Sequence, residues 1–233
     1  MNMLSKIAAV IIMSFSMTAL AEEPVAAQAQ QDFNPFADSY VSRMPAPAAV
    51  PAAPKLFAGR DKVADYYRLL QDGYELLGYS SFRAGHVPPE KLSEQAASLH
   101  SDLVMVYTEG VDRLPGASAS GSTQSSDEDP TLYEYFASYW VKLPTPLLGL
   151  HVQRYTPEPQ VSGGLEVLAV VLKSPAALAG LQRGDILLRL GDVELRQPEE
   201  LVQAAQRYAG QSVDVRFRRD DAEMHTNVTL NSL

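Results

Sequence analysis

The sequence predicts an α+β protein in which two folded domains follow one another. First, strand-like, helical and strand-like patterns alternate with short connections between residues 56 and 143. Second, the pattern changes at Pro144, after which five short β-type runs and two short helical segments follow. Third, 46% of the 233 residues are hydrophobic, which is enough to fill two small cores. We therefore expect a small α/β domain over 56–143 and, over 144–233, a domain of five to six short strands capped by two helices.

The N-terminal segment, MNMLSKIAAVIIMSFSMTALAEEP, has the pattern of a secretory signal peptide. Lys6 supplies the positive start, an apolar stretch covers Ile7–Leu20, and the small residues Ala19 and Ala21 mark a cleavage site. The apolar stretch is shorter than the roughly 20 residues that a membrane span requires. We therefore expect cleavage of 1–21 after Ala21, export to a bacterial periplasm, and no integral membrane span in the mature chain.

Residues 22–55 are dominated by alanine, proline and glutamine, and they end in MPAPAAVPAAP. Such a composition buries too little apolar surface to offset the entropy of ordering, so it predicts a disordered tether. Phe33, Phe36 and Tyr40 interrupt this segment. These aromatic residues fit two alternatives, namely side chains incidental to a disordered tail, or a short segment that docks on the domain or on a partner.

The domain over 56–143 begins with a predicted helix, DKVADYYRLLQDG, whose apolar side chains recur at helical spacing before a glycine stop. The strand YELLGYSSF, the helix PPEKLSEQAASLHS and the strand DLVMVYT follow and predict a right-handed βαβ unit. Residues 110–130, rich in serine and glycine with an acidic end, predict a flexible loop. A further strand, LYEYFASYWVKL, returns as a hairpin strand, with one face formed by Tyr133, Tyr135, Ala137 and Tyr139 and the other by Phe136 and Trp140.

A segment rich in small residues, SPAALAGLQRGD, starts at Ser174. Ser174 suits a helix N-cap, and Pro175 suits the first helical position. Gly180 fits a left-handed helix exit, which a side chain would oppose by about 1 kcal/mol. Gly184 and Gly191 fit the tight turns that follow. We expect these residues to shape the fold rather than to contact a ligand.

From LLGLHV to NVTL, over roughly 147–231, the sequence resembles a PDZ domain of the type found in the HtrA family of bacterial envelope proteins. The resemblance implies a groove in which a glycine-containing loop offers backbone N–H groups to the terminal carboxylate of a peptide. The strand after this loop would pair with the peptide, and a long helix would form the other wall. Carried onto this sequence, the peptide-binding residues are Leu148, Gly149, Leu150, His151, Val152, Leu201, Ala204, Ala205 and Tyr208.

Some of these assignments leave an alternative open. Leu201, Ala205 and Tyr208 recur at i, i+4 and i+7 along PEELVQAAQRYAG, which is typical of one helix face. Leu201 and Tyr208 fit core packing as well as a groove wall. Leu150 also fits a core position from which only its N–H serves the carboxylate. His151 fits either a contact with a peptide side chain or a surface position.

Composition excludes several classes of function. The formal net charge of −9 argues against a nucleic-acid partner, because phosphate binding needs a basic surface. The absence of cysteine excludes disulfides, metal–thiolate sites and the bacterial lipoprotein route of membrane attachment. The four histidines lack the spacing of a metal motif. No metal or cofactor is therefore expected.

The serine of VSGG, Ser162, resembles a protease nucleophile, but it falls inside the PDZ-like segment, where a Ser-Gly-Gly turn is structurally ordinary. The segment ahead of it is too short for the protease domain that HtrA proteases carry. We therefore expect a periplasmic adaptor or scaffold that is not an enzyme. It would bind protein C-termini with an apolar last residue, or extended segments, and use the 56–143 domain for another envelope protein. The alternative is an envelope enzyme with catalytic groups around Arg83, His86 and Tyr107.

Overall fold

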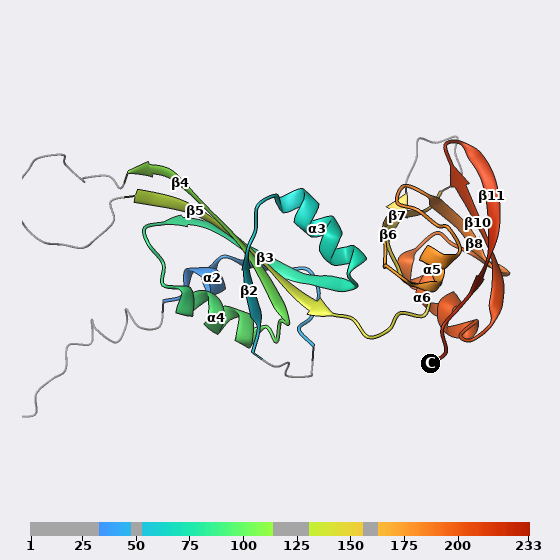
Figure 1. Cartoon of the computed structure of the whole chain (residues 1–233), viewed down its shortest axis with the longest axis horizontal. Coiled ribbons are helices and arrows are strands. Elements are labelled where there is room, and N and C mark those ends of the chain that lie inside the picture. The colour runs from blue at the N-terminus through green and yellow to red at the C-terminus, as the bar shows by residue number, and fades with distance from the viewer. Residues whose placement is uncertain (1–32, 48–52, 114–130, 156–162) are drawn as a thin grey trace, which may run out of the picture. The chain divides into compact units, whose positions relative to one another are not determined.

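The computed structural model describes residues 33–47, 53–113, 131–155 and 163–233 (Figure 1). The predicted signal peptide and Ser162 lie outside these ranges, as does much of the predicted tether. Within the described ranges, no helix is long and apolar enough to cross a membrane. The described elements form two sheets with a few short helices, which confirms the α+β fold class.

The N-terminal sheet has five strands in the order β1-β3-β5-β4-β2. These strands are β1 (Tyr40–Ser42), β2 (Lys55–Ala58), β3 (Tyr74–Ala84), β4 (Leu103–Arg113) and β5 (Thr131–Lys142). Helices α2 (Pro35–Asp38) and α4 (Pro89–Ser98) cover one face of the sheet, whereas α3 (Lys62–Gln71) covers the other (Figure 1). The sheet is therefore the middle layer of three.

Alternation along β5 supplies both faces of this sheet, as the sequence predicts. Tyr135, Ala137 and Tyr139 lie in the buried cluster on the side of α2 and α4. Phe136 and Trp140 lie on the side of α3. This division follows from the period of two in a strand, in which successive side chains point to opposite faces.

The predicted βαβ unit consists of β3, α4 and β4. β3 and β4 run parallel to each other, but β5 lies between them and pairs antiparallel with both. The two strands of the unit are therefore parallel, as predicted, but the hairpin strand β5 separates them in the sheet. Local patterns identify the strands, but a strand that arrives later in the chain competes for the same backbone hydrogen bonds.

Part of the predicted tether is folded. The side chain of Asn34 caps α2 by accepting a hydrogen bond from the Phe36 N–H at 3.0 Å, and β1 pairs with β3. Phe36 is only 2% exposed, and its ring lies edge-on to those of Phe82 and Tyr135. Of the two alternatives for these aromatic residues, the structure shows the segment docked on the domain, so the prediction of a disordered tether does not hold for this stretch. Burial of an aromatic side chain stabilises an alanine- and proline-rich chain that would otherwise lose too much entropy on ordering.

The predicted flexible loop also starts later than expected. β4 continues through Arg113, and Gly110 lies opposite Tyr133 of β5. The prediction is wrong for 110–113, because the hairpin partner supplies a ladder of backbone hydrogen bonds there. The remainder of the predicted loop, 114–130, lies outside the described residues.

The C-terminal domain is built on a second sheet in the order β11-β10-β8-β7-β6, and β9 pairs with β8. Its strands are β6 (Leu150–Tyr155), β7 (Gly164–Val170), β8 (Ile186–Leu190), β9 (Val193–Glu194), β10 (Ser212–Arg219) and β11 (Ala222–Thr229). Two helices, α5 (Pro175–Leu178) and α6 (Pro198–Arg207), complete the domain. The predicted number of short strands and helices is confirmed.

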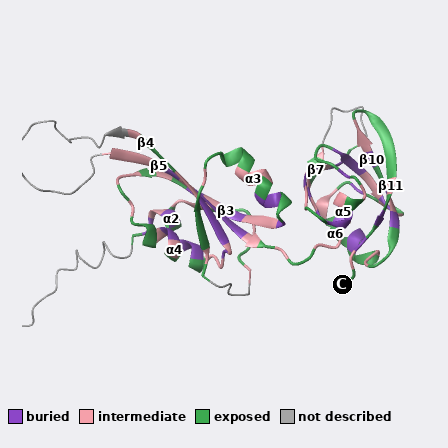
Figure 2. Ribbon diagram, in the orientation of Figure 1, coloured by how far each residue is buried: buried purple, intermediate pink, exposed green. Residues whose placement is uncertain are grey.

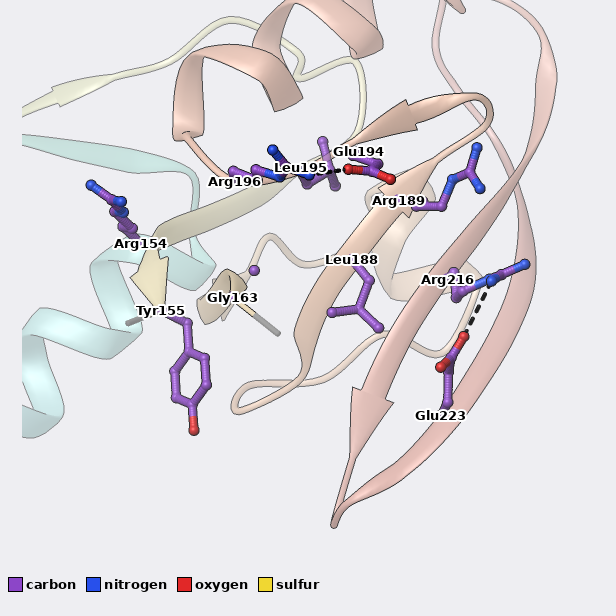
Figure 3. Close-up of a pocket in the computed structure, with 11 residues that line it drawn as sticks. Arg154, Tyr155, Gly163, Leu188, Arg189, Glu194, Leu195, Arg196, Arg216 and Glu223 are labelled. Atoms are coloured by element: carbon purple, nitrogen blue, oxygen red, sulfur yellow. Dashed lines mark hydrogen bonds and ion pairs between the residues drawn. The ribbon is translucent and has the colours of Figure 1, made fainter. Parts of the chain in front are cut away.

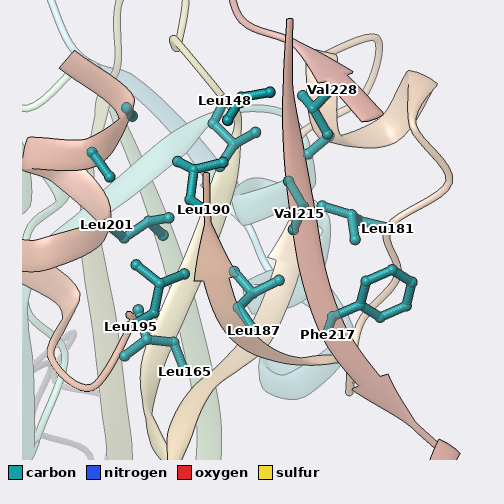
Figure 4. Close-up of a cluster of buried hydrophobic side chains, with 14 of the residues drawn as sticks. Leu148, Leu165, Leu181, Leu187, Leu190, Leu195, Leu201, Val215, Phe217 and Val228 are labelled. Carbon is teal, nitrogen blue, oxygen red and sulfur yellow. The ribbon is translucent and has the colours of Figure 1, made fainter. Parts of the chain in front are cut away.

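The core of this domain is aliphatic, in contrast to the aromatic clusters of the first sheet. Leu165 of β7 and Leu187 and Leu190 of β8 are completely buried. Figure 2 shows buried stretches, in purple, on strands and helices of both domains. They share one cluster with Leu201 of α6 and Val215 of β10 (Figure 4). Packing against this cluster holds α6 on the sheet.

The segment that begins at Ser174 folds as its composition predicts. The Ser174 hydroxyl accepts a hydrogen bond from the Ala177 N–H at 3.2 Å, and Pro175 occupies the first position of α5. Gly180 follows the helix with φ of +77°, a left-handed conformation that favours glycine. The small residues of α5 allow it to lie close to the sheet, and Ala176 is completely buried.

Candidate functional site

The most prominent feature of the C-terminal domain is the edge strand β6. It pairs with β7 on one side, and no strand among the described residues pairs with its other side. A concavity beside β6 is lined by the segment Leu148–His151 and by residues of α6. An unpaired strand edge presents N–H and C=O groups in the spacing that another extended chain needs.

The loop that leads into β6 has an unusual orientation of its peptide groups. The carbonyl oxygens of Leu147, Leu148 and Gly149 accept hydrogen bonds at 3.0, 3.0 and 2.9 Å from the N–H groups of Asn231, Ala176 and Val171. Among the described residues, no backbone carbonyl accepts a hydrogen bond from the N–H of Leu148 or Gly149. The loop therefore directs its acceptors into the fold and leaves two donors for an anionic group.

Gly149 is required for this orientation. Its φ is +87°, which a residue with a side chain adopts only with strain. A Cβ atom at this position would lie 2.2 Å from the Cβ atom of Ser174, the residue that caps α5. The close approach of loop and helix cap therefore requires a glycine at position 149.

The opposite wall of the concavity is the face of α6 that carries Leu201, Val202, Ala205 and Gln206. Leu201 and Ala205 are buried against the core, whereas Val202 is 56% exposed. The small side chain of Ala205 leaves room between helix and strand, and the aliphatic neighbours make the space apolar. The concavity thus combines a free strand edge, two backbone donors at one end and an apolar wall.

A model of the PDZ domain family matches residues 166–219. The C-terminal domain is a PDZ domain. The match runs from β7 into β10 and includes α6. The loop Leu147–Gly149, which we call the donor loop, and β6 precede it in the chain. The geometry of the loop is therefore an independent observation, and it is the arrangement by which PDZ domains receive the C-terminus of a peptide.

Comparison with a curated relative concerns a short segment. The chain is 33% identical over 60 residues to the zinc metalloprotease RasP of Shouchella clausii. These residues make up 26% of this chain and 14% of that relative, so most of the relative has no counterpart in the match.

Solved structures similar to this chain include PDZ domains of HtrA-type proteins. The HtrA3 PDZ domain bound to a phage-derived ligand, FGRWV, is 26% identical, with 37% of this chain and 85% of that chain covered and a TM-score of 0.33. The HtrA-type protease AlgW with a decapeptide is 18% identical, with 47% and 40% covered and a TM-score of 0.34. The serine endoprotease from Yersinia pestis is 23% identical, with 38% and 29% covered and a TM-score of 0.32.

Six of the predicted peptide-binding residues line the concavity: Leu148, Gly149, Leu150, His151, Leu201 and Ala205. The other three do not. Val152 packs against the core cluster, and Ala204 is buried within it. Tyr208 follows α6 as its C-cap, and its hydroxyl donates a hydrogen bond to Asp192. For Tyr208 the core-packing alternative is the better description, because its ring also packs against the PDZ core cluster.

Two residues of the α6 wall were missing from the prediction. Val202 and Gln206 line the concavity, each one position after a predicted residue. The groove-facing row therefore follows i, i+1, i+4 and i+5 rather than i, i+4 and i+7. The sequence signal was a second apolar residue, Val202, directly after Leu201, but periodicity alone does not show which side of a helix meets the core.

Two of the three residues of the alternative enzyme hypothesis, Arg83 and Tyr107, have partners of their own. An Arg83 guanidinium nitrogen lies 3.1 Å from a carboxylate oxygen of Glu134, and the Tyr107 hydroxyl donates to Asp65 at 3.0 Å. Burial raises the pKa of Tyr107, and the Asp65 carboxylate raises it further. No hydrogen bond in the described part of the chain joins Arg83, His86 and Tyr107 to one another. Across the whole described part of the chain, no group of three or more His, Cys, Asp or Glu side chains is placed to hold a metal ion.

Proposed function

We propose that this protein is an exported bacterial adaptor that holds the C-terminal ends of other envelope proteins in the groove between β6 and α6, and that it has no catalytic activity of its own. The observation that carries the proposal is the loop Leu147–Gly149, whose carbonyls are engaged and whose donors remain open beside a free strand edge. The signal-peptide pattern of residues 1–21 supports export.

Binding would follow β-strand addition. A peptide adds to the free edge of β6 in the antiparallel sense, and its terminal carboxylate accepts hydrogen bonds from the loop N–H groups. Its last side chain then enters the space beside Leu201 and Ala205, which favours an apolar residue. A micromolar dissociation constant, roughly −8 kcal/mol, is expected for such a short contact.

The N-terminal domain would contact a second partner. A cavity of about 240 Å³ lies between α3 and the sheet, and its wall includes the rings of Tyr66, Tyr79, Tyr107, Phe136 and Trp140. An aromatic surface of this kind suits binding, whereas a catalytic cleft gathers several convergent polar groups.

The central experiment is peptide binding to the mature chain, 22–233, measured by fluorescence anisotropy. Peptides that end in Val or Leu should bind with saturation, whereas the same peptides with a C-terminal amide should lose at least about tenfold in affinity, because one charge-assisted contact is removed. Absence of saturable binding across a varied set of C-terminal peptides would contradict the proposed function.

Substitutions locate the binding site. Ala205→Trp fills the groove and should abolish binding, and Val202→Glu places a charge at the exposed part of the same wall. Ala222→Trp, at an exposed position at the start of β11, is the matched control and should leave the affinity unchanged. Thermal denaturation of each variant separates loss of binding from loss of folding.

A further inference from the structure

A further cavity of the PDZ domain lies at the end of β6 remote from the donor loop. Its volume is about 580 Å³, and it opens beside Arg154 and Tyr155, the last two residues of β6 (Figure 3). Arg189 of β8, Arg196 in the connection to α6, and Arg216 of β10 also line it. We call this cavity the arginine trough.

Positive charge predominates in the arginine trough. Two carboxylates line it, and each is paired: Glu194 with Arg196 at 2.6 Å, and Glu223 with Arg216 at 3.3 Å (Figure 3). Among the described residues, no carboxylate lies in ion-pair distance of the two other arginines, Arg154 and Arg189. Two cationic groups therefore remain uncompensated in a chain whose formal net charge is −9.

The side chain of Arg189 has a hydrogen-bond donor without an acceptor in the described structure. One of its guanidinium nitrogens donates to the backbone carbonyl of Asp192 at 3.3 Å. Its Nε atom is buried and has no hydrogen-bond partner in the described structure. A buried donor without a partner costs free energy, so an anionic group in the trough would relieve this cost.

The trough lies where a bound peptide would arrive. β6 starts at Leu150, beside the donor loop, and ends at Tyr155. A peptide antiparallel to β6 with its last residue next to Leu150 places the fourth residue before the last next to Arg154, because each residue advances both strands by about 3.3 Å. On the other wall, Arg196 directly precedes the N-cap of α6, Gln197. Both walls of the groove therefore end in arginines.

We propose that the arginine trough is a specificity site for acidic side chains in the bound peptide, four to six residues before its C-terminus. The inference rests on the proposed function, since it names the class of C-terminal segment that the groove selects. Asp and Glu fit the trough because a guanidinium group donates two parallel hydrogen bonds to a carboxylate. The apolar last residue then supplies affinity, and the acidic segment supplies selectivity.

Peptides of ten residues with one common apolar C-terminal tetrapeptide test this site on the mature chain. They carry Glu, Gln or Lys at the three positions four to six residues before the last. The Glu peptide should bind about tenfold more tightly than the Gln peptide in 50 mM salt, and the Lys peptide should bind most weakly.

Matched variants assign the effect to the trough. Arg154→Gln should remove most of the advantage of the Glu peptide, and Arg154→Glu should reverse the order of the Glu and Lys peptides. Arg207→Gln is the control, because Arg207 lies near the end of α6, pairs with Asp192 and does not line the trough. This variant should preserve the preference.

The outcomes separate the two proposals. Equal affinity for Glu and Gln peptides, with the tetrapeptide tail still required, would overturn the acidic specificity and leave the groove proposal standing. Equal loss of the preference in Arg154→Gln and Arg207→Gln would overturn the assignment to the trough. Absence of binding by every peptide, including the common tail, would overturn both proposals.

Discussion

The two ends of β6 offer very different surroundings to an extended chain. Near Leu150, the groove combines backbone donors with an aliphatic wall that includes Leu201 and Ala205. Near Arg154 and Tyr155, it opens into a cavity rimmed by arginines. Backbone donors and apolar surface accept any chain with a free carboxylate and a suitable last residue, whereas paired and unpaired guanidinium groups discriminate by charge. In the proposed function, one end therefore supplies affinity and the other selectivity.

The largest effect is expected from a substitution in the PDZ core, which supports both ends of β6. Leu187 is completely buried in β8, so Leu187→Ala should lower the free energy of unfolding by about 3 kcal/mol through lost burial and a residual cavity. Chemical denaturation of the isolated variant measures this loss. Leu178→Ala, at a leucine of α5 that is 83% exposed, is the control and should change stability by less than about 0.5 kcal/mol.

The next effect addresses the apolar end alone. Replacing the last residue of a bound peptide, Val, by Gly should weaken binding by about 2 kcal/mol, because an aliphatic side chain no longer leaves water. Calorimetric titration should give the same loss of binding free energy at 50 and 500 mM salt, since burial of apolar surface is insensitive to screening. A loss that shrinks strongly with salt would contradict an apolar pocket at this end.

A smaller effect is expected from salt concentration at the end of β6 that opens into the arginine trough. The advantage of an acidic peptide over its Gln counterpart should fall about threefold between 50 and 500 mM salt, because the Debye length becomes shorter than the reach of exposed guanidinium groups. Anisotropy titrations over this range measure how steeply the affinity ratio of the two peptides falls with salt concentration. The Arg154→Gln variant should show a shallower slope, and an unchanged slope would argue against a direct contact.

The smallest effect is expected from pH at the start of α6, which adjoins the arginine trough. Hydrogen bonds from the backbone N–H groups of Arg196 and Gln197 hold the pKa of Glu200 below its ordinary value of 4.5. A carboxyl whose pKa is lower in the folded state stabilises that state fully above 4.5, and this contribution disappears as the pH falls through the folded pKa. Thermal denaturation between pH 3 and 6 should therefore show a slight loss of stability below pH 4.5.

Glu200→Gln should reduce that loss, because the remaining amide does not titrate. Glu199→Gln removes a neighbouring carboxylate that takes no part in the capping box of α6, and it serves as the control. Equal acid sensitivity in the wild type and Glu200→Gln would show that another group is responsible.

Prediction from the sequence succeeded where the determinants are local. Ser174, Pro175 and Gly180 specify the start and end of α5 by hydrogen-bonding capacity and backbone preference, and the structure shows each in the expected position. The alternation along β5 likewise revealed which aromatic residues share a face. Both signals act within a few residues of each other along the chain.

Prediction failed where distant segments meet. The aromatic residues around Phe36 left a disordered tether and a docked segment open as alternatives, and only the structure shows the Phe36 ring packed against Phe82 and Tyr135. Tyr208 continues a helical repeat, but it turns to Asp192 rather than to the groove. These positions were decided by contacts across the sheet or across the domain, which contribute more free energy than the local preference of a residue.

The sequence by itself determined the fold class, because turns, caps and periodicity are encoded in neighbouring residues. Its resemblance to a known family indicated the PDZ character of the C-terminal domain and the loop around Gly149. Only the tertiary structure decided that the carbonyls of this loop turn inward and that α6 presents Val202 and Gln206 to the groove. It also gathered the arginines of β6, β8, β10 and the α6 connection around one cavity. Charges separated by up to 62 positions in the chain become neighbours only when strands pair, so their combined field is a property of the fold.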